Sequence, residues 1–278
     1  MKNLGKKKIR TILNSLANEI ELASKAYFSD NSPVLSDGEY DSLVKRFEKI
    51  KKEYPDLAIG NDPSTRIGDT ASSAFTKVEH NIRLLSLSNA FNQEDVLRFD
   101  ESIKRFLGLE LSNAIEYMAE PKIDGLSLAL KYRDGHLVTA ATRGDGKIGE
   151  DVTHNALTIN DIPKKITNAP EFLEVRGEVY ILKSDFIKLN NSQEAGGQKP
   201  FANARNAAAG SLRQIDSQVT KNRPLRFFAY SLDGIAYSLA SSQKKLMSVL
   251  SDFGFIINRH STFCIGVDDL IKAYEKIS

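Results

Sequence analysis

The stretch EPKIDGLSLALKYRDGHLVTAAT, residues 120–142, decides the fold of this chain. From residue 126 to 131, leucines alternate with small or polar residues, which is the period-two pattern of a strand with one buried face. Asp134-Gly135 is a two-residue turn signal, and residues 137–142 are the returning strand of a hairpin. The stretch therefore predicts a sheet built mainly from antiparallel strands.

Further elements are predicted outward from this hairpin. Residues 173–181 and 226–232 are strand candidates, and residues 268–277 have the spacing of a helix. In the first of these strands the valines share one face, and Glu174, Arg176, Glu178 and Tyr180 share the other. Residues 190–200 are polar and rich in glycine, which predicts a loop.

The N-terminal part has a different period. Apolar residues recur at helical spacing from Ile9 to Tyr27, and Ser36 with Glu39 forms a capping-box pattern that begins a second helix. Pro55 follows the expected end of that helix, and residues 56–69 have the composition of a linker. We therefore expect an α+β protein with a small helical domain at 1–68 and an antiparallel-rich domain at 69–278.

Composition limits the function classes. The chain has 278 residues, of which 41% are apolar and 27% charged, with a net charge of +2, so a DNA surface would need local clusters of Lys and Arg. The single cysteine, Cys264, excludes an internal disulfide and a multi-cysteine zinc site. The four histidines lack metal-ligand spacing, so no residue is assigned to a metal. No apolar run resembles a membrane span or a signal peptide, which predicts a cytoplasmic protein.

Lys122 lies in Glu120-Pro-Lys-Ile-Asp-Gly125, between two predicted strands. A lysine acts as a nucleophile when its amine is neutral, and burial or a neighbouring cation favours that form. Asp124 alone favours the charged amine, whereas Gly125 permits close approach of a ligand to the backbone. The alternative is an ordinary exposed lysine beside an acid, and the motif by itself favours that alternative.

Residues 143–149, Arg-Gly-Asp-Gly-Lys-Ile-Gly, formally match the Gly-x-Gly-x-x-Gly dinucleotide turn. However, the preceding strand belongs to a hairpin, and the turn is charged where a nucleotide-binding βα turn follows an apolar strand. A redox enzyme that uses this turn is thus a weak alternative. A basic loop that contacts phosphate and a plain hairpin loop both remain open.

Two polar clusters lie on predicted helices. Asp37, Tyr40 and Asp41 share one helical face, which suits a cationic pyridinium ring and its ribose, although the acids also simply complement the helix dipole. Asn203 is placed to cap a helix that carries Arg205, with Arg213 at its far end. These arginines either face phosphates or are solvated on a packed helix.

Together these pieces resemble the NAD-dependent DNA ligases of bacteria. Any one motif is weak, but six occur in the family's order from about residue 10 to the end of the chain. The six motifs are SDGEYD (36–41), LSLSNAF (85–91), EPKIDG (120–125), ATRGDG (141–146), EVRGE (174–178) and FANARNAAAGSLRQ (201–214).

The resemblance implies a role for each site residue. Lys122 is expected to attack the α-phosphorus of NAD and carry AMP, with Asp124 as the second catalytic residue. The expected contacts to NAD are Tyr27, Asp37, Gly38, Glu39, Tyr40 and Asp41 for the nicotinamide mononucleotide half, Ser86, Leu87, Glu120 and Tyr230 for adenine, and Arg143 and Glu178 for the ribose and phosphate. Arg205, Arg213 and Arg223 are expected near the phosphate of a DNA nick.

The resemblance also implies a nucleotidyltransferase domain of ATP-grasp-like fold, truncated at its C-terminus. NAD is expected as an AMP donor, magnesium as the metal ion, and nicked double-stranded DNA as the partner. The family continues with Asp-Gly-Val-Val-x-Lys and an OB-fold, and this sequence stops before both. Either a second polypeptide is expected to supply them, or the sequence is a fragment of a longer ligase. The alternative function is a non-catalytic NAD-binding or scaffold subunit derived from a ligase.

Overall fold

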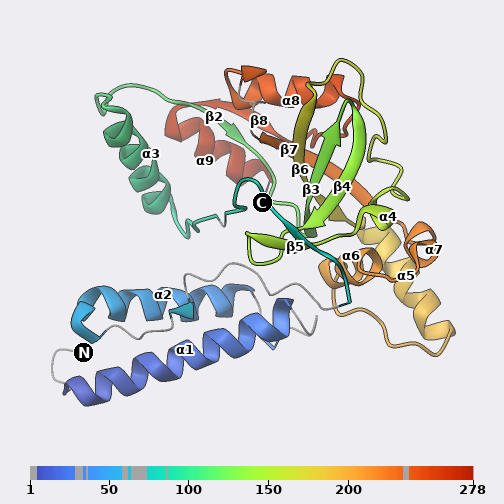
Figure 1. The fold of residues 1–278 in the computed structure, drawn as a ribbon. Coiled ribbons are helices and arrows are strands. Elements are labelled where there is room, and N and C mark those ends of the chain that lie inside the picture. Colours follow the sequence, from blue (N-terminus) through green and yellow to red (C-terminus); the bar gives the residue numbers. More distant parts are fainter. Residues whose placement is uncertain are drawn as a thin grey trace. The chain divides into compact units, whose positions relative to one another are not determined.

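A computed structural model gives the fold, which is α+β as expected (Figure 1). The structure describes residues 5–28, 34–35, 37–57, 62–63, 74–85, 87–233 and 238–277, without the side chains of Tyr27, Phe28 and Asp37. The chain divides into two compact units, one of residues 1–85 with 143–150 and the other of residues 86–142 with 151–278.

The first unit contains the predicted helical pair, α1 (Lys6–Phe28) and α2 (Asp37–Glu53), followed by the short helix η1 (Pro55–Leu57). Apolar positions three and four apart give each helix one stripe, and the two stripes pack together. The buried members are Ile9, Leu13, Leu16, Ala17, Ile20, Phe47 and Ile50. The predicted capping residue Ser36 lies outside the described residues.

The same unit contains a two-stranded antiparallel sheet of β1 (Lys77–Glu79) and β5 (Ile148–Glu150). The glycine-rich loop precedes β5, and the backbone of Leu84 donates a hydrogen bond of 2.9 Å to the Gly146 carbonyl. Leu84 and Gly146, which lie 62 positions apart in the sequence, are therefore joined through a backbone hydrogen bond.

The second unit is organised around a four-stranded sheet in the order β4-β3-β6-β7 (Figure 1). Its strands are β3 (Leu126–Arg133), β4 (His136–Thr142), β6 (Phe172–Tyr180) and β7 (Arg226–Asp233). All neighbours are antiparallel. The predicted hairpin is confirmed: Asp134 and Gly135 both have positive φ, 48° and 74°, as a two-residue turn between twisted strands requires.

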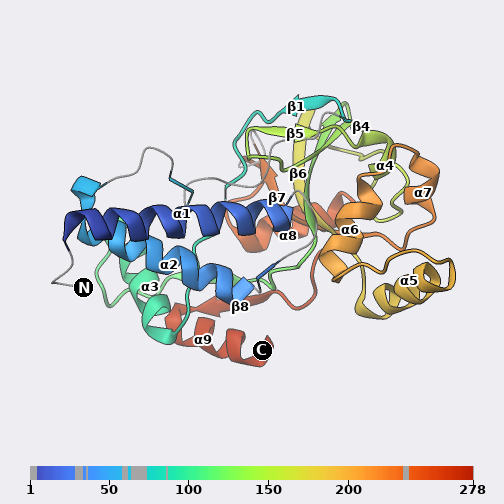
Figure 2. The same cartoon turned by 90° about the horizontal axis from the view of Figure 1, so that it is seen from below.

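Helices cover this sheet. α6 (Ala204–Leu212) packs against β3 and β6, and it lies beside α5 (Lys183–Ala195) and α7 (Ser217–Lys221) (Figure 2). α4 (Thr153–Ala156) packs on β4, and α8 (Gln243–Asp252) packs on β7. Consequently both faces of β6 are buried, including the face that carries alternating polar residues.

A smaller layer completes this unit. β2 (Glu116–Ala119) pairs with β8 (Thr262–Ile265), and α3 (Gln93–Leu107) and α9 (Gly266–Ile277) pack near them. The predicted C-terminal helix is confirmed by α9. Cys264 of β8 is buried.

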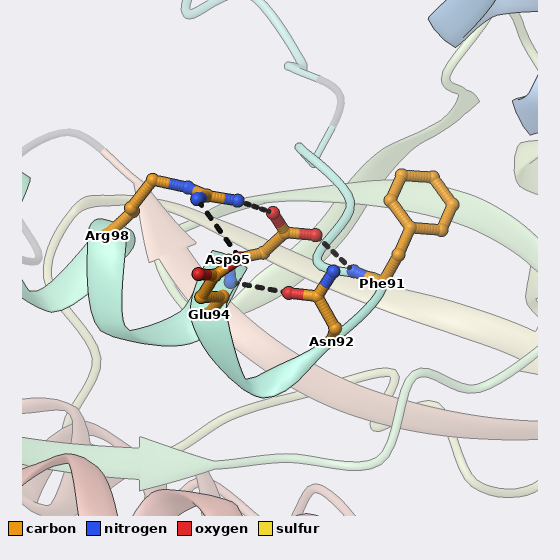
Figure 3. A network of polar contacts seen from close by, with 5 residues as sticks. All are labelled: Phe91, Asn92, Glu94, Asp95 and Arg98. Carbon is orange, nitrogen blue, oxygen red and sulfur yellow. Dashed lines mark hydrogen bonds and ion pairs between the residues drawn. The ribbon is translucent and has the colours of Figure 1, made fainter.

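α3 is absent from the sequence predictions, although its start carries clear boundary signals (Figure 3). The Asn92 side chain accepts a hydrogen bond from the backbone N–H of Asp95, and the Asp95 carboxylate accepts one from Phe91, both at 2.9 Å. Arg98 pairs with Asp95 and with Glu94. This reciprocal arrangement satisfies backbone donors that the first turn leaves without helical partners.

The loop predicted at residues 190–200 is wrong, because α5 continues to Ala195. The hydrogen-bonding groups of the Asn190 side chain in this segment are paired through a tertiary contact. The Asn190 side chain exchanges two hydrogen bonds of 2.9 Å with the backbone of Phe201. Of the residues 190–200, only 196–200 are irregular.

None of the described helices is long and apolar enough to cross a membrane.

Candidate active site

The Lys122 loop connects β2 to β3, so the lysine lies between the two sheets of the second unit. Its side chain is exposed. Gly125 anchors the loop: a Cβ atom there would meet the Val179 carbonyl oxygen at 2.1 Å and Glu178 Cγ at 3.1 Å. Because the close contact is with the backbone of β6, only a residue without a side chain fits, which gives Gly125 a packing role.

Glu178 lies on β6 directly opposite Ser127 of β3. Glu178 is only 7% exposed, and one carboxylate oxygen accepts a hydrogen bond of 2.8 Å from Ser127 Oγ. Ser127 is a residue that the sequence analysis missed as part of the site. Its signal was the alternation of residues 126–131, which places Ser127 on the face opposite the leucines.

Asp124 is joined to Arg205 of α6 across 81 positions of sequence. The guanidinium lies 3.3 Å from the carboxylate; the Arg205 side chain is 16% exposed and the Asp124 side chain 59%. The predicted cap is confirmed, since Asn203 Oδ1 accepts a hydrogen bond of 2.7 Å from the backbone of Asn206. Arg205 therefore places a positive charge beside the Lys122 loop and offsets the charge of Asp124.

Glu120 begins the same loop and is half-buried. Gln243, the first residue of α8, donates one hydrogen bond of 2.7 Å to the Glu120 carboxylate and one of 3.0 Å to the Tyr230 carbonyl. Burial raises the pKa of the Glu120 carboxyl, and the hydrogen bond from Gln243 opposes that rise. No sequence pattern pointed to Gln243.

Tyr230 lies at a bulge of β7. Arg176 pairs with Ser231 and Gly177 pairs with Ala229, so Tyr230 is the extra residue where the register shifts. A bulge bends a strand and redirects the side chain at that position. Gly177 makes this geometry possible, because a Cβ atom there would lie 2.2 Å from the Phe227 ring and 2.3 Å from the Phe228 carbonyl oxygen.

The other polar residues of the EVRGE motif form a buried ion-pair group. Arg176 pairs with Glu174 at 3.2 Å and with Asp233 of β7. Burial raises the pKa of Asp233, and the positive charge of Arg176 opposes that rise. This group joins β6 to β7, so the motif combines structural positions with Glu178 of the candidate site.

The glycine-rich loop belongs to the first unit and leads into a strand, which excludes the strand-to-helix turn of a dinucleotide fold at this place. Asp145 holds the turn by accepting two backbone hydrogen bonds of 2.8 Å, from Lys147 and Ile148. Burial acts to raise the pKa of Asp145, but these bonds outweigh it and leave the pKa lowered. Arg143 begins this loop and is half-buried.

The predicted nicotinamide-site residues lie at the end of α1 and the start of α2. Tyr40 is half-buried, and its hydroxyl shares a hydrogen bond of 2.8 Å with Ser24 of α1. Asp41 is half-buried, whereas Gly38 and Glu39 are exposed. The side chains of Tyr27 and Asp37 lie outside the described residues.

The remaining predicted residues are spread over the chain. Ser86 lies outside the described residues, and Leu87 is 76% exposed. Arg213 follows α6 and is half-buried. Arg223 contacts Gln193 at 3.4 Å, and its guanidinium lies 6.0 Å from the centre of the Phe201 ring.

The structure thus brings together Lys122, Asp124 and Arg205 at one loop, and Glu178 and Glu120 beside it. Within the residues that the structure describes, no group of three or more His, Cys, Asp or Glu side chains is placed to hold a metal ion. Magnesium is commonly held by one or two carboxylates together with substrate phosphates. The carboxylates of Asp124 and Glu178 are compatible with an ion of that kind.

Two family models match the chain. The NAD-dependent DNA ligase adenylation domain matches residues 72–278, and the DNA ligase-like N-terminal NAD⁺-binding domain matches residues 6–68. The matches together account for nearly all of the chain.

Relatives of known name give the same result. The DNA ligase of Dinoroseobacter shibae is 49% identical over 268 residues, which are 96% of this chain and 36% of that protein. The DNA ligase of Roseobacter denitrificans is 46% identical over 99% of this chain and 39% of its own length. The DNA ligase of Rickettsia canadensis is 46% identical over 98% of this chain and 39% of its own length. The chain therefore spans somewhat more than a third of each of these relatives.

Proposed function

The chain belongs to the family of NAD-dependent DNA ligase adenylation domains, and from that premise we propose that Lys122 takes AMP from NAD. The observation that supports this assignment is the Lys122 loop itself. Gly125 fixes the loop against β6, and the Asp124–Arg205 pair joins it to α6. A nucleophile held on both sides by packed elements keeps a defined position relative to its substrate.

In the proposed step the neutral amine of Lys122 attacks the α-phosphorus of NAD. A nitrogen–phosphorus bond forms, the bond from phosphorus to the bridging oxygen breaks, and nicotinamide mononucleotide leaves with the electron pair of that bond. The amine loses a proton in the same step. Charge builds on the phosphate oxygens, so cations such as Arg205 and Arg143 are suited to stabilise it.

Magnesium would add positive charge at the same phosphates when bound. Asp124 and Glu178 are the residues that we propose as its nearest carboxylates. Glu178 is also proposed to contact the ribose of the nucleotide.

The noncovalent contacts to NAD are proposed in two groups. Glu120, Ser86 and Leu87 are proposed as contacts to adenine, and the ring of Tyr230 is proposed to stack on the base. The start of α2, with Asp37, Gly38, Glu39, Tyr40 and Asp41, and Tyr27 of α1 are proposed to bind the nicotinamide mononucleotide half. In support, the family model that covers residues 6–68 is named for NAD⁺ binding. We accordingly propose a boundary between residues 1–68 and 69–278.

The acceptor of the AMP is proposed to be the 5′-phosphate of nicked double-stranded DNA. That phosphate attacks the adenylyl phosphorus, Lys122 is released, and the 3′-hydroxyl then displaces AMP to seal the nick. Arg205, Arg213 and Arg223 are proposed near the nick phosphate because their charge suits it. Since NAD and chromosomal DNA meet in the bacterial cytoplasm, we propose that compartment, with roles in replication and repair.

Mass spectrometry tests the first step directly. The chain is incubated with NAD and magnesium, and peptides are searched for an adenylyl group. We expect the group on Lys122, and none in Lys122→Ala. Lys131 of β3 gives a matched control, because it is a neighbouring lysine on the same segment to which no role is assigned. If wild-type protein carries no adenylyl group on Lys122, the proposal is wrong.

A non-catalytic NAD-binding subunit is the second candidate. It predicts that Lys122→Ala binds NAD as the wild type does and that neither protein forms an adduct. Calorimetry of NAD binding beside the adduct assay separates the two candidates. The presence of Lys122, Asp124 and Glu178 together in one region favours the enzyme.

A further inference from the structure

We propose that Gln243 is a positioning residue that fixes the Glu120 carboxylate for recognition of the amino group of adenine. This inference rests on the proposed function and deepens it, because it concerns how the same site selects its base. It concerns a residue 123 positions away from Glu120 in the sequence.

The first argument is the geometry of one side-chain amide. Nε2 of Gln243 lies 2.7 Å from Glu120 Oε1 and 3.0 Å from the Tyr230 carbonyl oxygen. A carbonyl and an ionised carboxylate only accept hydrogen bonds, and an NH₂ group has two hydrogens. The two hydrogens therefore match the two acceptors, and the orientation of the amide is determined by its partners.

The second argument is that the amide itself is held in place. Gln243 is the first residue of α8, whose start is capped by Ser242 accepting a hydrogen bond of 3.2 Å from the backbone of Lys245. Leu246 and Leu250 are buried on the same helix, which packs on β7. A group on a capped and packed helix is more precisely placed than one on a loop.

The third argument concerns which base the pair selects. Glu120 is half-buried, and burial favours its neutral form, whereas a donor such as the Gln243 amide favours the ionised form. An ionised carboxylate accepts hydrogen bonds and cannot donate them. It therefore matches the exocyclic amine of adenine and opposes the carbonyl oxygen that hypoxanthine carries at that position.

The Tyr230 contact extends the argument to the face of the base. Through its second hydrogen, Gln243 holds the backbone at the β7 bulge from which the Tyr230 ring extends. One amide thus connects the residue proposed at the edge of adenine with the residue proposed at its face. Loss of the amide is expected to weaken base selection more than contacts elsewhere on NAD.

The test compares binding of NAD with binding of deamino-NAD, in which hypoxanthine replaces adenine, by calorimetry on the whole chain. We expect the wild type to prefer NAD. In Gln243→Met, which keeps the length of the side chain but has no donor, we expect the ratio of the two dissociation constants to fall about tenfold, as the loss of one hydrogen bond to a charged group predicts. Gln243→Glu places a second carboxylate against Glu120 and is expected to lower the ratio at least as far.

Gln93 provides the matched control. It is also the first residue of a capped helix, α3, and its amide also contacts a glutamate, Glu275, at 3.4 Å on the exposed surface. Gln93→Met is expected to leave the ratio unchanged. Thermal unfolding shows whether each variant is folded. Methionine and glutamate at position 243 pack differently, so if one variant does not fold, the other still tests the inference.

The outcomes separate the inference from the proposed function. If the wild type binds neither dinucleotide, the proposed function is wrong and this inference falls with it. If the wild type prefers NAD and both Gln243 variants keep the full preference, the proposed function stands and the positioning role of Gln243 is wrong. An equal loss of affinity for both dinucleotides would also overturn the inference, because a merely structural role predicts that result.

Discussion

Substitution of Gly125 by alanine tests how the Lys122 loop is held. The added Cβ atom would lie 2.1 Å from the Val179 carbonyl oxygen, well inside the 3.4 Å at which ordinary van der Waals contact begins. The neighbour is the backbone of a central strand, so relief requires β3 or β6 to move. Inserting a methyl group into such a site costs about 1–3 kcal/mol of unfolding free energy.

The size of the effect on melting follows from the size of the unit. For domains of 150–250 residues, each kcal/mol changes the melting temperature by roughly 2–4 °C. Gly125→Ala is therefore expected to lower the Tm by roughly 2–12 °C. It is also expected to slow adduct formation at Lys122, because a displacement of about 1 Å at a reacting group costs up to roughly a hundredfold in rate.

Urea denaturation followed by circular dichroism measures the stability, and mass spectrometry measures the adduct. Gly196→Ala is the control, since its nearest neighbour would lie at 3.4 Å and its φ of −85° suits alanine. That control is expected to unfold within about 0.5 kcal/mol of the wild type, or to be slightly more stable. If Gly125→Ala unfolds at the same urea concentration as the control, the close approach to β6 does not constrain the loop and our reasoning is refuted.

Two further predictions concern stability. The Asp100 carboxylate forms a buried ion pair of 2.7 Å with Lys104. Asp100→Asn leaves the charge of Lys104 uncompensated and is expected to lower the free energy of unfolding by about 3–5 kcal/mol in urea denaturation. A loss below about 1 kcal/mol would contradict this. Tyr132 is buried, and its hydroxyl donates a hydrogen bond of 2.7 Å to the Pro163 carbonyl. Burial raises the pKa of this hydroxyl above the ordinary 10.0. The stability that the neutral hydroxyl contributes is therefore complete below pH 10.0 and is lost as the pH rises through the raised pKa. Urea midpoints measured from pH 10.0 upward should fall less steeply with pH in Tyr132→Phe than in the wild type. Equal slopes in the two proteins would show that the Tyr132 hydroxyl does not cause the pH dependence.

Much of the fold was predictable because its signals are local. Alternation over residues 126–131 and the Asp134-Gly135 turn specify a hairpin through neighbouring residues alone. The helical pair follows from apolar spacing between Ile9 and Ile50. The order of strands β4-β3-β6-β7 was not predictable, because pairing of β3 with β6 joins segments that are separated by a long connection.

The failures have physical causes as well. The end of α5 was predicted as a loop because residues 190–200 are polar and rich in glycine, whereas in the folded chain two hydrogen bonds to Phe201 satisfy the Asn190 side chain. α3 was missed although Asn92 and Gly108 mark its ends with clear capping signals. In that case the information was local and available.

For the candidate site, the sequence identified candidate residues, and the structure showed which residues lie next to them. The resemblance carried by the six motifs in family order implied roles for Lys122, Asp124 and Glu178. The roles of these residues remain proposals that the adduct experiment tests.

The sequence by itself determined the helical pair, the central hairpin and the position of the lysine between two strands, because short-range periodicity and turn chemistry specify them. Only the tertiary structure decided that Arg205 meets Asp124 and that Gln243 meets Glu120. These partners lie 81 and 123 positions apart, and they come together because the packing of α6 and α8 on the sheet brings them there.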